Sequence, residues 1–257
     1  MSIADLPELR SPPAATAAQM AEADRVAASE LGIPLEVLME NAARQIAAAT
    51  RSFRGSVDGR RVVAVCGTGN NGGDALGALR HLHGWGAQVE AVVAAPRDRL
   101  RPLAALQLDI LDRLGVPCDD AGAMDDAAIV DRLRAADVLL DGLLGYSASG
   151  APRGEIARLI ALMTGGRREG RIVAVDLPSG LDPDTGATLN GGPAGAVRAA
   201  LTVTLALPKT GLLRAEAREW VGDLVLADIG IPAKAYEGLG IAAQRLFADG
   251  DLVRIIP

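Results

Sequence analysis

A predicted strand, a glycine-rich turn and a predicted helix follow one another between Arg61 and Gly84, and this stretch constrains the fold most strongly. It opens on the apolar run RVVAVC, continues through four glycines in GTGNNGGD, and leaves in a segment with helical spacing. Glycine allows positive φ angles and close approach of a ligand to the backbone. The N-H groups that open the next helix attract anionic oxygen. The stretch therefore predicts an α/β unit that binds a phosphorylated compound.

The turn fits the pattern G-x-G-x-x-G at residues 67, 69 and 72, which is a weak signal by itself. In nicotinamide dehydrogenases an acidic residue ends the second strand, about 20 residues further on. Here the second predicted strand, roughly Ala87 to Ala95, carries its only acid, Glu90, in the middle. A P-loop is excluded because no lysine follows the glycines. The usual dinucleotide-binding interpretation is therefore disfavoured.

Two amides and a carboxylate, Asn70, Asn71 and Asp74, lie within this glycine turn. Amide oxygens and a carboxylate suit a hard cation or a ribose hydroxyl. The alternative is structural: the asparagines accept strained turn geometry while Asp74 caps the helix. The sequence alone leaves both interpretations open.

The composition favours one large α/β domain that spans residues 1 to 257. Hydrophobic residues make up 49% of the chain but aromatic residues only 2%, so Val, Leu, Ile and Ala must build the core. Such a core suits parallel strands covered by helices on both faces. The net charge of −6 argues against a general nucleic-acid surface.

The chain shows no secretory signal and no apolar run long enough for a membrane span, so we expect a cytoplasmic protein. Its two cysteines, Cys66 and Cys118, do not form a disulfide framework, which agrees with a reducing compartment. We expect Cys66 to be a core residue. His81 and His83 are not expected to bind a metal, since they lie on different helix faces.

Strands and helices alternate along most of the chain, which predicts a parallel, doubly wound sheet. Residues 1 to 13 are expected to be a flexible lead, followed by two helices separated at Gly32 and Pro34. The last predicted strand, in DLVLADIGIP, is followed by a tail. The remaining predicted helices lie near 100–114, 124–135 and after 153. The remaining strands lie near 137–140, near 171–175 and in LTVTLALPKTGLL, and a short strand or loop is expected near 117.

Polar clusters follow the last apolar residue of four predicted strands. They contain Asn70 to Asp74, Asp141 to Gly150, Asp176 to Ser179, and Pro208-Lys209. Ligands of open parallel sheets bind beyond the carboxyl ends of the strands, so the four loops should converge on one site. An unpaired carboxylate beside a hydrophobic core is costly, and a cation or a substrate hydroxyl would compensate for it.

Several motifs together resemble the NAD(P)H-hydrate epimerases, the YjeF N-terminal domain family. They are LMENAA, CGTGNNGGDALGALRHL, VLLDGLLGYS, VAVDLPSGLDPDTG, ALPKTGLL and ADIGIP, and they extend from about Ala17 to Ile231. The resemblance implies a Rossmann-like three-layer α/β/α sandwich with a mostly parallel sheet and an N-terminal helical lead. It also implies a homodimer that interconverts the R and S forms of hydrated NADH or NADPH. A separate ADP- or ATP-dependent dehydratase would then use the S form.

The same resemblance implies a bound potassium ion, with Asn71, Asp141 and Ser179 as its ligands. Oxygen donors suit such a hard cation. Asp176 is the candidate general acid and base at C6 of the hydrate. The implied substrate contacts are Asn70, Asn71, Gly72, Gly73, Asp74, Gly145, Tyr146, Ser147, Ala148, Ser149, Gly150, Ala151 and Asp176.

Several alternatives stay open at this point. Lys209 either contacts the substrate or caps a strand end, and Asn41 is either ligand-facing or solvated. The preference for NADH or NADPH hydrate is undecided, with Arg97 and Arg153 as candidates for a 2′-phosphate contact. A non-catalytic scaffold of the same family is the competing function. Ala75 and Ala151 depart from residues common in relatives, which affects only the detailed substrate contacts.

Overall fold

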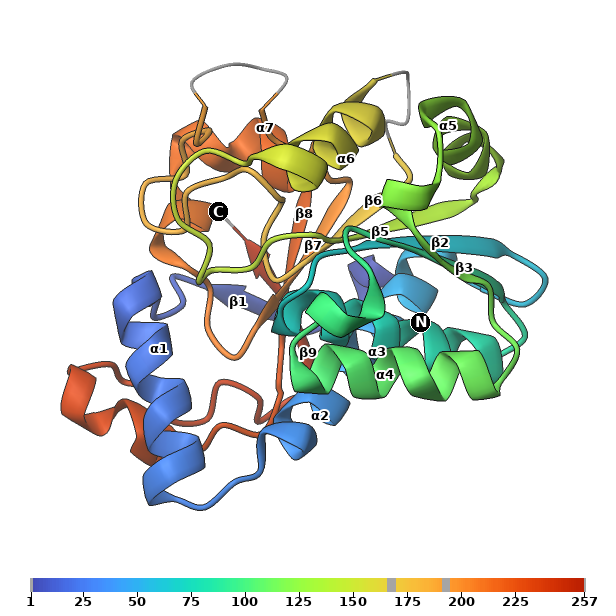
Figure 1. Ribbon diagram of the computed structural model, residues 1–257. Coiled ribbons are helices and arrows are strands. Elements are labelled where there is room, and N and C mark those ends of the chain that lie inside the picture. Colours follow the sequence, from blue (N-terminus) through green and yellow to red (C-terminus); the bar gives the residue numbers. More distant parts are fainter. Residues whose placement is uncertain (1, 166–169, 191–194, 257) are drawn as a thin grey trace.

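The computed structural model describes residues 2–165, 170–190 and 195–256 (Figure 1). Its strands form one sheet in the order β1-β9-β8-β7-β6-β5-β2-β3-β4. The strands are β1 (Glu8–Arg10), β2 (Arg61–Cys66), β3 (Gln88–Val93), β4 (Cys118–Asp120), β5 (Val138–Gly142), β6 (Ile172–Val175), β7 (Leu201–Leu205), β8 (Asp223–Ala227) and β9 (Leu252–Ile256). The α-helices are α1 (Ala17–Arg25), α2 (Leu35–Arg54), α3 (Asn70–Gly84), α4 (Pro102–Arg113), α5 (Asp126–Ala135), α6 (Gly154–Thr164) and α7 (Arg218–Val221).

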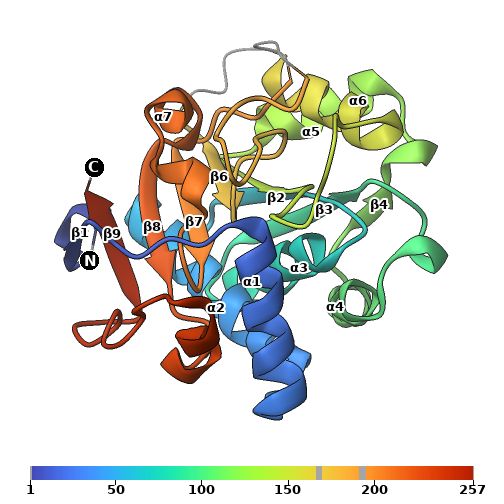
Figure 2. The same cartoon turned by 90° about the vertical axis from the view of Figure 1, so that its left-hand side faces the viewer.

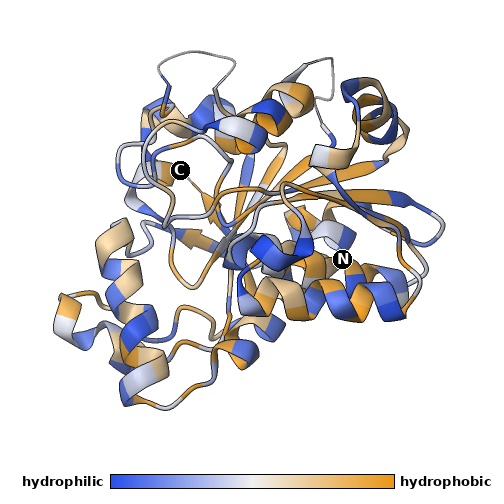
Figure 3. Cartoon of the chain, in the orientation of Figure 1, coloured by the Kyte–Doolittle hydropathy of each residue, from blue (hydrophilic) through white to orange (hydrophobic). Residues whose placement is uncertain are grey.

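Helices cover both faces of the sheet, with α2, α3 and α4 on one side and α5 and α6 on the other (Figure 1). Successive side chains of a strand point to opposite faces. In β2, Val62 and Ala64 accordingly pack into the core beneath α2 and α3, while Val63 and Val65 pack against α5 and α6. The central strands are mostly apolar, as Figure 3 shows. The predicted three-layer arrangement is confirmed, and Cys66 is a buried core residue as expected.

The strand order reverses between β2 and β5. From β2 the chain moves outward through β3 and β4, then returns to β5 on the other side of β2 and continues through β6, β7 and β8. All neighbouring strands from β4 to β8 are parallel. Such a reversal leaves a crevice beyond the carboxyl ends of the strands.

The predicted helical lead is present. Thr16 caps α1 by accepting the Gln19 N-H at 3.2 Å, and the Gln19 side chain accepts the Thr16 N-H in return. A short π-helical segment, Val26–Glu30, extends α1. Gly32 then turns the chain with a φ of 72°, and α2 begins directly after Pro34.

Two predictions about the chain ends are wrong. Part of the expected flexible lead forms β1, and part of the expected tail forms β9, which lie side by side in Figure 2. Strand β9 runs antiparallel to β8 and buries Leu252, Val253 and Ile255, while β1 pairs with its outer edge. Both strands are too short to show a long alternating pattern in the sequence, so periodicity alone does not reveal them.

A third correction concerns the glycine turn. Helix α3 begins at Asn70, so the expected loop residues Asn70 to Asp74 are its first turns, and Gly69 rather than Asp74 occupies the N-cap. None of the glycines at 67, 69, 72 and 73 has a positive φ. Gly67 and Gly72 are instead required for close packing: a Cβ on Gly67 would lie 2.0 Å from the Leu143 carbonyl oxygen, and one on Gly72 would lie 2.1 Å from the Gly67 oxygen.

Candidate functional site

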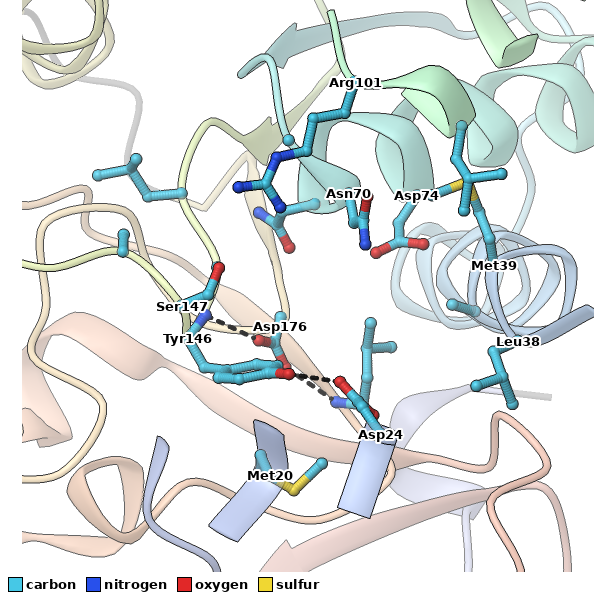
Figure 4. A pocket seen from close by; sticks show the side chains of 18 of the residues that line it. Met20, Asp24, Leu38, Met39, Asn70, Asp74, Arg101, Tyr146, Ser147 and Asp176 are labelled. Carbon is cyan, nitrogen blue, oxygen red and sulfur yellow. Dashed lines mark hydrogen bonds between the residues drawn. The ribbon is translucent and has the colours of Figure 1, made fainter. Parts of the chain in front are cut away.

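A cavity of about 340 Å³ lies beyond the carboxyl ends of β2, β5, β6 and β7 (Figure 4). Its walls come from the start of α3, the loop that follows β5, Asp176 after β6, and Leu205 at the end of β7. Helices α1 and α2 close another side with Met20, Asp24 and neighbouring apolar residues. The volume is that of a small-molecule site. Three of the four expected loops therefore converge on the cavity, whereas Pro208 and Lys209 do not line it.

The structure brings most of the predicted substrate contacts to this cavity, but not all of them. Those that line it are Asn70, Asn71, Asp74, Gly145, Tyr146, Ser147, Ala148 and Asp176. Those that do not line it are Gly72, Gly73, Ser149, Gly150 and Ala151. Gly73 instead allows α3 to pack closely on Met39 and Ala104.

Asp176, the first residue after β6, is strained and firmly held. Its φ is 68°, an unusual value for a residue other than glycine, and only 3% of its surface is exposed. Its Oδ1 accepts hydrogen bonds from Lys209 Nζ and, at 3.3 Å, from the Leu205 N-H. Its Oδ2 accepts the Tyr146 N-H at 3.3 Å. A carboxylate can accept about four hydrogen bonds, so one acceptor position is left for a ligand.

Lys209 lies behind Asp176 and is only 1% exposed. Besides the ion pair with Asp176, its Nζ donates to the Leu205 carbonyl at 3.0 Å and lies 3.4 Å from Thr204 Oγ1. Lys209 is not part of the cavity wall. The structure therefore favours the second role considered from the sequence, in which Lys209 caps a strand end. It also shows that Lys209 is the ion-pair partner of Asp176.

Two further carboxyl groups face the cavity. Asp74 enters it from α3, and Asp24 lies on the opposite side beside Tyr146 and Asp176 (Figure 4). Burial raises the pKa of Asp74 well above its ordinary value, and the charges of Asp176 and Asp24 raise it further. Burial also raises the pKa of Asp24, against the opposing effect of its hydrogen bond with Tyr146.

Asp24 was not predicted from the sequence. It lies in α1 and accepts a hydrogen bond from the hydroxyl of Tyr146, which is 122 residues further along the chain. Met20, four residues earlier, lines the cavity too, as expected for one helix face. An acid within the polar run AEADR carries no signal that separates it from the solvated acids beside it.

Asp141 and Ser179 lie beneath the cavity floor, and both are fully buried. Asp141 is within β5 rather than directly after it, which corrects the predicted strand end. Its Oδ1 accepts the Ser179 hydroxyl at 2.6 Å, and its Oδ2 accepts the Ser179 N-H at 2.8 Å. Burial raises the pKa of Asp141 to about 6, although these hydrogen bonds act in the opposite direction.

Asn71 lines the cavity, and its buried amide nitrogen makes no hydrogen bond. Turning the amide over would place its oxygen there instead. The Asn71 side chain lies against Gly145, in the loop that joins Asp141 to Tyr146. An amide, a carboxylate and a hydroxyl form an oxygen donor set that fits a hard monovalent cation. Within the described ranges no three His, Cys, Asp or Glu side chains are grouped as metal ligands.

Three other candidates lie outside the cavity. Asn41 does not line the cavity; it is half-buried, and its Nδ2 donates to the Ile229 carbonyl at 3.0 Å. Arg97 pairs with Asp112 at 2.8 Å on the surface, and Arg153 is the residue before α6. The arginine that does line the cavity is Arg101, whose side chain points into it in Figure 4.

Comparisons with known proteins agree with this site and fold. The chain is 40% identical over 92% of its length to an NAD(P)H-hydrate epimerase from Dehalogenimonas lykanthroporepellens, of which it covers 90%. It is 41% identical over 85% of its length to a bifunctional NAD(P)H-hydrate repair enzyme Nnr from Moorella thermoacetica, but it covers only 41% of that protein. A crystal structure of the yeast protein ynu0, YNL200c, has a TM-score of 0.79 and 22% identity, covering 94% of this chain and 99% of that one, which shows the common fold.

The family model described as the YjeF-related protein N-terminus matches residues 35–211. That range begins at α2 and ends after Lys209, so it includes the described cavity residues of α3, the loop after β5 and Asp176, while α1 precedes it. In the part of the chain that the structure describes, no helix has the length and apolar character to cross a membrane. The family match and the 40% identity to the Dehalogenimonas protein lead to one conclusion: this chain belongs to the YjeF-related protein N-terminus family.

Proposed function

We propose that this protein is an isomerase that interconverts the R and S forms of hydrated NADH and NADPH. The observation that carries the proposal is the cavity at the strand ends, where Asp176 presents a carboxylate with one free acceptor position. The 40% identity to an NAD(P)H-hydrate epimerase, over nearly the whole of both chains, supports the same activity.

The reaction breaks and remakes one C-O bond at C6 of the hydrated ring. The lone pair of the ring nitrogen forms a C=N bond as the C6 hydroxyl leaves, and a proton from an acid converts the departing hydroxide into water. Water then adds to the other face of the iminium, which returns the C=N electron pair to nitrogen, and the added water loses a proton to a base. We propose Asp176 as the group that exchanges this proton on one face.

Asp74 is suited to the other face. It enters the cavity from the side opposite Asp176, and its raised pKa favours the protonated form, which can donate. Asp176 is held by the Lys209 ammonium and keeps one acceptor position toward the cavity. We propose that one of the two carboxyl groups gives a proton while the other accepts one, and that their roles exchange in the reverse direction.

We propose that Asn71, Asp141 and Ser179 hold a potassium ion. A bound cation would favour the ionised form of Asp141 and supply positive charge beneath the cavity floor. The unpartnered Asn71 amide and the oxygen donors of Asp141 and Ser179 support this assignment. Arg101, at the cavity wall, is the proposed contact for the substrate phosphates.

Some relatives are named bifunctional NAD(P)H-hydrate repair enzymes, so they join two activities in one chain. We propose that the second activity is a dehydratase, which would use the hydrate after epimerisation. The predicted partner is therefore an ADP- or ATP-dependent dehydratase. The predicted homodimer and cytoplasmic location belong to the same proposal, and light scattering of the purified protein would measure the dimer mass.

The decisive experiment follows consumption of the purified R hydrate with a dehydratase in excess to remove the S form. We expect consumption faster than the spontaneous epimerisation, and loss of that acceleration in Asp176→Asn with the melting temperature retained. A control variant, Asp249→Asn, removes an exposed aspartate and should keep full activity. A folded wild-type protein that adds nothing to the spontaneous rate would favour the non-catalytic scaffold instead.

A further inference from the structure

Helix α1 contributes to the cavity although it precedes the residues that the family model matches. Its inward face places Met20 and Asp24, one turn apart, on the cavity wall. The other carboxylate of the helix, Glu22, faces solvent and pairs with Arg25 at 2.7 Å. One helix therefore offers one half-buried acid at the cavity and another that pairs with Arg25 away from it.

Tyr146 joins Asp24 to the proposed catalytic group. Its hydroxyl donates to Asp24 Oδ2, and its backbone N-H donates to Asp176 Oδ2 at 3.3 Å (Figure 4). Lys209 Nζ lies 5.6 Å from the centre of the Tyr146 ring, so the ring also lies against the cation that pairs with Asp176. A displacement of Tyr146 would therefore change two of the groups that hold the Asp176 carboxylate.

The loop that carries Tyr146 has few other fixed points near the cavity. Its glycine at 145 lies against the Asn71 side chain, and the Leu144 N-H donates to Ser179 at 2.9 Å. These contacts fix the start of the loop, whereas the bond to Asp24 fixes the far end of the Tyr146 side chain. The two ends of this tyrosine are thus held by elements that are widely separated in sequence.

We infer that Asp24 is a positioning residue of the epimerase site, which fixes Tyr146 and thereby the orientation of Asp176 toward the substrate. This inference rests on the proposed function. A carboxylate that accepts a phenol hydrogen bond orients the ring strongly, because charge-assisted hydrogen bonds are about twice as strong as neutral ones. Misorientation of a reacting group by about 1 Å can lower a rate about 100-fold.

The test compares Asp24→Ala, Tyr146→Phe and the double variant in the coupled hydrate assay. We expect each single variant to lower kcat about 10- to 100-fold with a smaller change in KM. The double variant should be no slower than the slower single variant, within about twofold, because both changes remove one interaction. Asp24→Asn should recover most of the rate, since an amide oxygen also accepts the phenol hydrogen bond.

Two control variants remove similar groups elsewhere. Glu22→Gln changes the exposed acid of the same helix, and Tyr236→Phe removes a buried hydroxyl that has no partner among the described residues. Both should keep the wild-type kcat. Rate losses that multiply in the double variant, or an Asp24→Ala variant as active as wild type, would overturn the inference while the epimerase activity stands. A wild-type protein without activity would instead overturn the proposed function.

Discussion

Asp141 and Asp176 occupy similar places, at the carboxyl ends of the neighbouring strands β5 and β6, but their surroundings differ. Asp141 is fully buried, and its hydrogen bonds from the described residues all come from neutral groups: the Ser179 hydroxyl and N-H and, at 3.4 Å, the Leu143 N-H. Asp176 faces the cavity, has a strained backbone and accepts from the charged Lys209.

This difference indicates that Asp141 has a structural role in the site, whereas Asp176 is placed to react with a ligand. The hydrogen bonds of Asp141 join the loops after β5 and β6, so its carboxylate fixes the cavity floor. Asp176 is paired with a cation on one side and open to a ligand on the other. Strain and a free acceptor position are typical of functional groups rather than of structural ones.

Removing the cation behind Asp176 should have the largest effect on stability. Lys209→Met leaves a buried carboxylate without its charge partner, and we expect a loss of about 4 kcal/mol in the free energy of unfolding. Denaturant unfolding measures it. Lys234→Met, at the exposed lysine, should change little. Adding Asp176→Asn to Lys209→Met should restore part of the stability, and a double variant no more stable than Lys209→Met would contradict the role of the ion pair.

Removing Asp141 should cost less. Asp141→Ala leaves the buried Ser179 hydroxyl and N-H without their acceptor, for an expected loss of about 2–3 kcal/mol. The same unfolding experiment applies, with Asp249→Ala as an exposed control. If the loss instead equalled that of Lys209→Met, the distinction between a neutral and an ionic environment for the two aspartates would fail.

A potassium ion held by the proposed ligands Asn71, Asp141 and Ser179 should stabilise the folded protein. At a concentration ten times its dissociation constant, an ion that binds only the folded protein stabilises it by about 1.4 kcal/mol. The melting temperature in potassium chloride should therefore exceed that in tetramethylammonium chloride for the wild-type protein. The increase should disappear in Ser179→Ala and persist in Asp24→Asn. An equal increase in all three proteins would indicate a general salt effect.

The sequence predicted the parallel sheet and the convergence of its loops because both follow from local patterns, apolar runs and the polar residues after them. It did not predict β1 and β9, because both depend on neighbouring strands: β1 has three residues at the sheet edge, and β9 lies between β1 and β8. Asp24 was missed for the same physical reason: its contact with Tyr146 exists only after α1 packs. Lys209 could be placed at a strand end, but not on Asp176, until the backbone turn at Asp176 was known.

Asp74 is a third buried acid, and it has neither the neutral donors of Asp141 nor the cationic partner of Asp176. Its side chain makes no hydrogen bond to any residue in the described ranges, and burial raises its pKa, aided by the charges of Asp176 and Asp24 and opposed by Lys209. A raised pKa in the folded protein means that its contribution to stability is fully present below the ordinary pKa of 3.8 and is lost as the pH rises through the folded-state pKa.

Asp74→Asn removes this loss because an amide does not ionise. Relative to the wild-type protein, the variant should gain a few degrees in melting temperature at pH 8 and nothing near pH 4, which thermal unfolding at both pH values would measure. Turnover of the hydrate should fall at the same time, because an amide cannot supply the proton. Asp98→Asn, at an exposed aspartate, should show neither change. A gain that is equal at both pH values would mean that Asp74 is not kept protonated by burial, and Asp176 would then have to serve both faces of the ring.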